Sequence, residues 1–166
     1  MRRVAAVCLS LAAVMATGCT GRVRSVSPTP PSPVTRVDAI NLWAVPPVAI
    51  NWDDMPGPDG VQVNVFLYQV DRAAPVLMKG TLEFSLYEGR RHADALREAK
   101  PLRTWTYTEQ ELATRQVRGI AGWGYGIQLG WGLQVPNSDI ITLVACYRPP
   151  KGAPIYSSPI IIAVSK

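Results

Sequence analysis

Apolar and polar residues alternate along much of the chain, and this period-two pattern predicts β-strands. Between residues 61 and 68, one parity is entirely aliphatic and contains Val61, Val63, Val65 and Leu67. Between residues 78 and 87, the apolar parity contains Met78, Gly80, Leu82, Phe84 and Leu86. Both patterns are typical of half-buried strands. The short polar link over residues 70–75 predicts that these two strands form an antiparallel hairpin.

The rest of the chain contains further candidate strands and two short helical segments. Proline, glycine or charged turns separate six more strand candidates, at residues 36–43, 48–52, 102–107, 122–133, 139–148 and 155–164. Helices are expected over 93–100 and 108–115, and the second begins with Thr108 and Glu111 in the spacing of a capping box. Many short strands without an alternating strand-helix-strand order predict an all-β fold, an antiparallel two-sheet β-sandwich of about eight strands with one or two short helices.

Glycine and aromatic residues alternate in the segment 119–133, which reads GIAGWGYGIQLGWGL. We expect a strand that turns its aromatic parity into the core and leaves a smooth, exposed glycine face, on which a loop, a helix or another chain can approach the backbone closely. Two alternatives stay open. Trp123, Tyr125 and Trp131 could form a surface platform that stacks against sugar rings, or the glycine face could itself be a docking surface.

The amino terminus has the pattern of a signal peptide. Met1, Arg2 and Arg3 form a short basic start, and residues 4–16 then contain no charge. This run is too short for a permanent membrane span, which needs about 20 apolar residues. We therefore predict a removable signal peptide over residues 1–18.

The segment Ala16-Thr17-Gly18-Cys19 resembles the lipobox of bacterial lipoproteins. The resemblance implies that Cys19 is lipidated after cleavage and anchors the protein to a membrane, with the domain facing the periplasm or the exterior. An aspartate directly after the lipidated cysteine would resemble an inner-membrane retention signal. This position is Thr20, and the lack of that aspartate favours the outer membrane in a Gram-negative host. The alternative is an ordinary signal peptide with Cys19 incidental.

The segment that follows is rich in proline and predicts a tether. Residues 20–34 read TGRVRSVSPTPPSPV, and proline-rich chain extends about 3.1 Å per residue. The predicted organisation is therefore a signal peptide over 1–18, a lipidated cysteine and proline-rich tether over 19–34, and a β-sandwich domain over 35–166.

The net charge is +5 for the whole chain, and removal of residues 1–18 leaves +3. Arg22, Arg24 and Arg36 lie close to the predicted lipid attachment, where basic side chains interact favourably with an anionic membrane surface. The remainder contains no basic stripe with interleaved aromatic residues, so we predict no nucleic-acid partner.

The sequence contains little recognisable catalytic chemistry. It has no G-x-S-x-G elbow, Walker loop, H-E-x-x-H or Cys-x-x-Cys motif, and we predict no catalytic residue, bound metal or cofactor. Cys146 lies in an apolar run and is expected to be a buried structural residue, with an intermolecular disulfide as the alternative. His92 is the only candidate base for that thiol. Glu83 and Glu88 leave open a hydrolase that uses paired carboxylates.

Three carboxylates occur together in residues 51–60, at Asp53, Asp54 and Asp59. Their order does not match the EF-hand pattern. Because Asp, Pro and Gly are typical of tight connections, we interpret this segment as a turn, with calcium binding as the alternative.

Three strand-like segments carry a further resemblance: VQVNVFLYQV, LMKGTLEFSLYEG and ITLVACYRPPKG. They are similar to segments of uncharacterised exported lipoproteins and, more loosely, of the outer-membrane lipoprotein of the type VI secretion system, itself a small sandwich. The predicted function is that of a membrane-anchored lipoprotein of the bacterial cell envelope with a non-catalytic binding or assembly role, and with an envelope protein as its partner. The alternative is a carbohydrate-binding module or hydrolase of the cell envelope.

Overall fold

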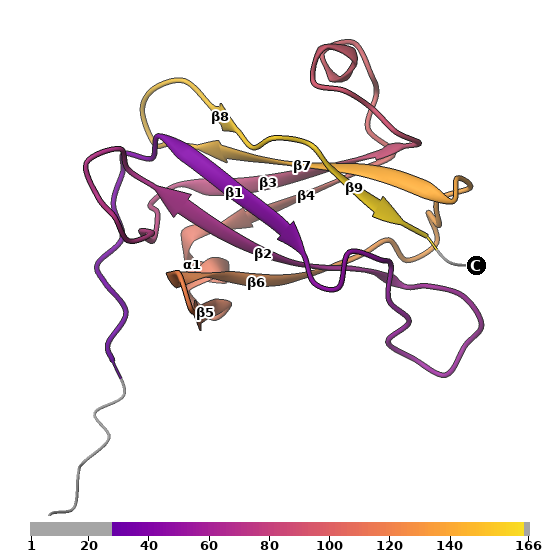
Figure 1. The fold of residues 1–166 in the computed structure, drawn as a ribbon, viewed down its shortest axis with the longest axis horizontal. Coiled ribbons are helices and arrows are strands. Elements are labelled where there is room, and N and C mark those ends of the chain that lie inside the picture. Colours follow the sequence, from indigo (N-terminus) through magenta and orange to yellow (C-terminus); the bar gives the residue numbers. More distant parts are fainter. Residues whose placement is uncertain (1–27, 165–166) are drawn as a thin grey trace, which may run out of the picture.

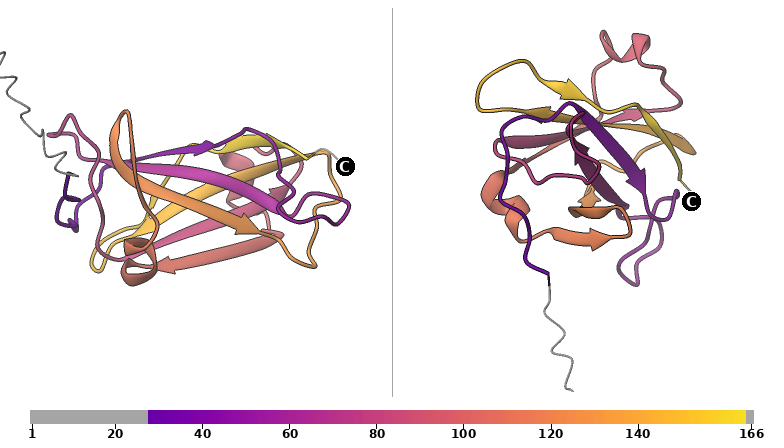
Figure 2. Two further views of the ribbon diagram at one scale, coloured as in Figure 1. Left: turned by 90° about the horizontal axis from the view of Figure 1, so that it is seen from below. Right: turned by 60° about the vertical axis from the view of Figure 1, so that its left-hand side comes forward.

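The computed structural model describes residues 28–164, which form two antiparallel sheets packed face to face (Figure 1, Figure 2). The signal segment and Cys19 lie outside the described residues. The strands are β1 (Ala39–Ala44), β2 (Gly60–Tyr68), β3 (Thr81–Glu88), β4 (Arg103–Thr108), β5 (Gln116–Gly119), β6 (Gly122–Gly130), β7 (Ile140–Arg148), β8 (Ile155–Tyr156) and β9 (Ile160–Ala163). The short helix α1 spans Glu109–Ala113, and a single 3-10 turn, η1, spans Asp94–Leu96.

The strand order confirms the predicted two-sheet antiparallel sandwich. The first sheet has the order β1-β2-β6-β5, and the second has the order β4-β3-β7-β8, with β9 also paired to β7. Inward-facing side chains of both sheets meet in one core, and those of β2 and β3 are fully buried at alternating positions. The predicted alternation therefore creates the inner faces of both layers.

The core also holds the polar ends of its large aromatic side chains. The Tyr125 hydroxyl accepts a hydrogen bond of 2.9 Å from the backbone N–H of Met78. The Trp131 indole donates a bond of 2.7 Å to the carbonyl oxygen of Pro58. These bonds let both side chains be buried almost completely, because a buried polar group without a partner would be costly.

The predicted hairpin between residues 61–68 and 78–87 is wrong, because β2 and β3 belong to different sheets. The connection between them contains three buried residues, Val76, Leu77 and Met78, which close one end of the sandwich. Gly80 then has a positive φ of 112°, a conformation that favours glycine and differs from that of a strand, and β3 begins only after it, at Thr81. Met78 is therefore part of the crossing and not part of the strand.

Several predicted boundaries also change. Residues 48–52 form only isolated bridges, at Val48 and Ile50, and the predicted last strand is divided into β8 and β9. The prediction missed β5. In place of the helix predicted over 93–100, the structure contains only the short turn η1. The second predicted helix is confirmed as α1, where Glu111 and Thr108 form the expected capping box.

Side chains of β4 bridge the two sheets along the part of β6 that β5 does not cover. The Trp105 indole donates a hydrogen bond of 3.1 Å to the carbonyl oxygen of Gly130, and Arg103 donates one to that of Trp131. The Tyr107 hydroxyl lies 3.4 Å from the carbonyl oxygen of Gln128. The backbone carbonyls along this edge of β6 are therefore satisfied by side chains in place of another strand.

Candidate functional site

Most of the predicted aromatic parity of β6 belongs to the core. Tyr125 is 2% exposed and Trp131 is fully buried, while Trp123 is half-buried and packs against the core cluster. The core-facing interpretation is therefore confirmed for Tyr125 and Trp131. A surface platform built from Trp123, Tyr125 and Trp131 is wrong, because two of the three rings present no face to a ligand. The strand also ends at Gly130, and Leu133 is fully exposed in the loop beyond it.

The opposite face of β6 is covered in part by side chains from neighbouring strands. Phe66 of β2 lies across Gly124, so that a Cβ atom added to Gly124 would be 2.7 Å from the Phe66 ring and 2.6 Å from the carbonyl oxygen of Val65. Val117 of β5 covers Gly126 in the same way. Gly124 is consequently buried, and the expectation of an exposed glycine face is wrong at this position. The close approach to the backbone is made here by residues of a paired strand, and not by the loop, helix or other chain that the sequence suggested.

At the far end of the same face, Trp52 lies over a pair of glycines. Gly60 of β2 is paired with Gly130 of β6, and a Cβ atom on Gly60 would lie 2.5 Å from the Trp52 ring. Trp52 belongs to the loop over residues 45–59. Glycines at paired positions of two strands leave room for a large side chain, but the pairing of Gly60 with Gly130 is visible only in the folded structure.

Two of the three carboxylates of that loop, those of Asp53 and Asp59, act as turn residues in the structure. One oxygen of Asp59 accepts hydrogen bonds from the backbone N–H groups of Trp52, at 2.6 Å, and Asp53, at 3.2 Å. Asp53 in turn accepts a bond of 2.7 Å from the N–H of Met55. These bonds hold the loop in place and thereby position the Trp52 ring on the sheet.

We use the term outer face for the surface of the β1-β2-β6-β5 sheet that points away from the core. Pairing of the strands arranges its central residues in rows, in which Gly60 is opposite Gly130, Gln62 is opposite Gln128, and Asn64 lies between Trp43 and Gly126. Trp43 is 52% exposed and packs edge-on against Phe66, with ring centroids 6.0 Å apart. The outer face therefore combines indole rings with amide side chains.

The strands of this sheet contribute no charged side chain to the outer face. Arg118 is the one charged residue in these four strands. It has the same parity on β5 as Gln116, which is opposite the buried Tyr125, so Arg118 does not belong to the outer face. Residues 28–164 as a whole carry 12 basic and 12 acidic side chains, so the excess charge of the chain lies outside this range. The charges of the domain are concentrated in its loops and in the second sheet.

A concave site of about 700 Å³ lies on the second sheet, beneath the segment that contains η1. Its lining includes Glu83, Cys146 and Tyr156, together with Asp94 and Arg97 from the overlying segment. Cys146 is 3% exposed, as predicted, and burial raises the pKa of its thiol. Because a protonated thiol is a poor nucleophile, this site lacks an activated cysteine.

Glu83 in that site is already paired. Its two carboxylate oxygens accept hydrogen bonds from Arg148, at 3.1 Å and 3.3 Å. Glu88 instead accepts bonds from the backbone N–H groups of Asn137 and Ser138. The two carboxylates that the sequence suggested as a hydrolytic pair therefore have separate structural partners.

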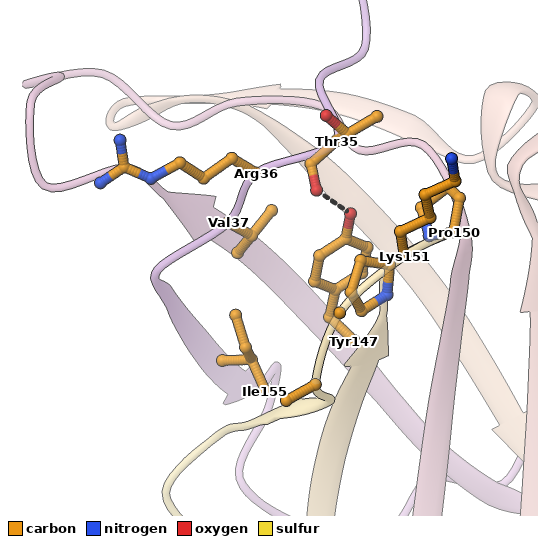
Figure 3. Close-up of a pocket in the computed structure, with 10 residues that line it drawn as sticks. Thr35, Arg36, Val37, Tyr147, Pro150, Lys151 and Ile155 are labelled. Atoms are coloured by element: carbon orange, nitrogen blue, oxygen red, sulfur yellow. Dashed lines mark hydrogen bonds between the residues drawn. The ribbon is translucent and has the colours of Figure 1, made fainter.

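A second cavity, of about 510 Å³, lies where the proline-rich segment enters the domain (Figure 3). The Tyr147 hydroxyl lies 2.7 Å from the carbonyl oxygen of Thr35 and 2.8 Å from that of Lys79, and its single proton is donated to one of them at a time. Val37 and Ile155 form part of the apolar wall, and the Arg36 side chain points away from Tyr147. This cavity is the junction between the amino-terminal segment and the sandwich.

Fold and surface thus define an antiparallel β-sandwich with one sheet whose strands contribute no charge to its outer face. A scan against protein-family models finds no match, and searches of curated proteins and of solved structures find no significant match. Between residues 28 and 164, no helix is long and apolar enough to span a membrane. Within the same range, no three or more Asp, Glu, Cys and His side chains are grouped so that they could hold a metal ion.

Proposed function

We propose that the protein is a lipid-anchored component of the bacterial cell envelope, attached through Cys19, and that its β-sandwich has a non-catalytic binding role. The observation that carries this proposal is the segment Ala16–Cys19, which resembles a lipobox and follows an apolar run of signal-peptide length. The domain would face the periplasm or the exterior, and the anchor would lie in the outer membrane if the host is Gram-negative.

The geometry of the chain entry supports a role as an anchored domain. Val34 is paired with Met78, and its backbone makes hydrogen bonds with the carbonyl oxygen of Leu77, at 2.8 Å, and the N–H of Lys79, at 2.7 Å. The contact of Tyr147 with Thr35 adds a second attachment point (Figure 3). A tether fixed in this way would hold one end of the sandwich toward the membrane.

The opposite end and the sheet faces would then remain accessible to a partner. The loop over residues 45–59 lies at the end of the sandwich away from the amino-terminal entry (Figure 1). Trp52 in this loop and Trp43 in β1 are both exposed on the outer face of the first sheet. These features support binding, since exposed aromatic side chains contribute strongly to recognition.

Lipidation is tested by expressing the full chain in a bacterial host and measuring the mass of its amino-terminal peptide, together with partitioning of the protein into detergent. We expect a diacylglyceryl modification on Cys19 and loss of detergent partitioning in Cys19→Ala. Cys146→Ala is the matched control, because it removes the other cysteine of the predicted mature chain and should retain the lipid. Unchanged partitioning of Cys19→Ala would contradict the proposal.

The binding role is tested by cross-linking in native envelopes, followed by purification of the anchored protein. We expect cross-linked species that contain an envelope component in addition to this chain. Recovery of only the monomer, under conditions in which a known envelope complex is captured, would contradict a binding or assembly role.

A further inference from the structure

We infer that the outer face of the β1-β2-β6-β5 sheet binds a neutral polysaccharide chain. This inference rests on the proposed location in the cell envelope, and it names the class of partner that the surface fits. It uses Trp43 and Trp52 with the amide side chains between them, and it does not involve Trp123, Tyr125 or Trp131.

The two exposed indoles are positioned as separate stacking surfaces. Trp52 lies over the Gly60–Gly130 row, and Trp43 lies in the row of Asn64. Residues 60 and 64 are four positions apart on β2, which corresponds to about 13 Å along the strand. Trp52 is 38% exposed and Trp43 is 52% exposed, so each retains surface for the apolar C–H face of a sugar ring.

Amide side chains occupy the space between the two indoles. Gln62 and Gln128 face each other in the row that separates Trp52 from Trp43, and Asn64 lies in the next row. Together with Asn41, these side chains make no hydrogen bond to any other residue of the described range. Each amide offers both a donor and an acceptor, which is the combination that a sugar hydroxyl requires.

The lack of charge decides between possible partners. An anionic polymer would lose hydration on this surface without gaining an opposite charge. The loop that carries Trp52 adds three carboxylates, at Asp53, Asp54 and Asp59, and no basic side chain, so this end of the surface disfavours an anionic chain. A neutral chain with many hydroxyl groups matches the amides and the uncharged strands between the two indoles.

The glycines keep the binding surface low and its aromatic rings in fixed positions. Because Gly60 and Gly130 have no side chains, the Trp52 ring lies directly on the sheet backbone. Phe66 packs edge-on against Trp43, and Phe66 itself lies on Gly124. Side chains that are already in place lose less conformational entropy when a ligand binds.

The test uses the full chain and its non-lipidated Cys19→Ala form, titrated with two neutral hexasaccharides, cellohexaose and chitohexaose. Binding is followed by tryptophan fluorescence and calorimetry. A galacturonic acid hexamer, which carries a carboxylate on each ring, serves as the charged probe. We expect at least one neutral hexasaccharide to bind, and we expect the charged hexamer to bind at least about tenfold more weakly.

Two variants remove the indoles and one pair removes the amides. Trp43→Ala and Trp52→Ala should each weaken binding of the neutral probe by about tenfold or more, and the double variant Gln62→Ala, Gln128→Ala should weaken it to a smaller extent. Tyr156→Ala is the matched control, since Tyr156 is an exposed aromatic residue on the second sheet. Circular dichroism verifies that each variant is folded.

Failure to bind either neutral hexasaccharide overturns the inference, as does equal binding by wild type and by both folded tryptophan variants. Stronger binding of the charged hexamer also overturns it, because the match to an uncharged surface is then wrong. These outcomes are distinct from a failure of the proposed function. If Cys19 carries no lipid, the anchoring proposal fails while the binding measurement on the Cys19→Ala form stands.

Discussion

The two faces of β6 fill space in opposite ways. On the inner face, the strand and the residue that follows it supply the large side chains of Tyr125, Ile127, Leu129 and Trp131, which are all buried. On the outer face, its glycines supply only backbone, and Phe66, Val117 and Trp52 come from other segments to cover it. The strand therefore contributes side chains to the core on one side, and on the other side its backbone is covered by side chains of other segments.

This difference makes the two faces sensitive to opposite changes. The inner face is damaged when atoms are removed, because a cavity remains in a closely packed core. The outer face is damaged when atoms are added, because a Cβ atom would collide with a neighbour that already occupies the space. Both effects are measurable as changes in the free energy of unfolding.

The largest effect is expected for Trp131→Ala on the inner face. Trp131 is fully buried, and its indole bonds the carbonyl oxygen of Pro58. Truncation of a buried tryptophan typically lowers the free energy of unfolding by about 3–5 kcal/mol. Urea unfolding followed by circular dichroism measures this loss. Trp43→Ala provides the comparison, and a loss as large as that of Trp131→Ala would contradict the assignment of Trp43 to the surface.

A smaller effect is expected from Gly124→Ala on the outer face. The added Cβ would lie 2.6 Å from the carbonyl oxygen of Val65, which cannot move without distorting β2. Such overpacking typically costs about 1–3 kcal/mol. Gly130→Ala is the matched control, because its Cβ would lie 3.4 Å from the Trp52 ring and would meet only ordinary contacts. Equal loss of stability in the two variants would show that crowding on the outer face is not the cause.

The sequence predicted the inner face more completely than the outer one. Alternation is a local property, so Tyr125 and Trp131 could be assigned to the core from the neighbouring residues alone. The covering of Gly124 by Phe66 depends on the pairing of β2 with β6, which separate segments of the chain establish only in the folded state. The sequence therefore indicated a close approach without indicating which residue makes it.

The candidate site follows the same division. Trp43 could have been assigned to a surface, because it has the opposite parity from Leu42 in a predicted strand. Trp52 lies in a loop, where no periodicity predicts the direction of a side chain. The wrong hairpin between β2 and β3 has a related cause, since the link over residues 70–75 has the length and polarity of a hairpin connection, although the buried residues Val76 and Leu77 that follow it close the end of the sandwich.

A substitution at the edge of β6 should lower the free energy of unfolding less than a substitution on either of its faces. Trp105→Phe removes the indole N–H that bonds the carbonyl oxygen of Gly130 at 3.1 Å, while most of the ring volume is retained. The expected loss is about 0.5–1.5 kcal/mol, the usual net contribution of one hydrogen bond. Urea unfolding measures it, and amide hydrogen exchange should show faster exchange along this edge of β6. A loss similar to that of Trp131→Ala would mean that Trp105 acts mainly through packing.

The smallest effects are expected from acid, and they should leave the comparison of the two faces unchanged. Hydrogen bonds from the N–H of Val70 and then from Arg36 lower the pKa of Asp38, and hydrogen bonds from the N–H and then the hydroxyl of Thr108 lower the pKa of Glu111. A carboxyl whose pKa is lower in the folded state stabilises that state above its ordinary value, here 3.8 for Asp38 and 4.5 for Glu111, and this stabilisation disappears as the pH falls through the folded pKa. The melting temperature should therefore decrease as the pH is lowered below these values, and this decrease should be less steep in the double variant Asp38→Asn, Glu111→Gln.

The strand β6 itself contributes no carboxylate to either face. The difference in unfolding free energy between Trp131→Ala and Gly124→Ala should therefore be the same at pH 5 and pH 7. A difference that changes with pH would place a titrating group on one of the faces.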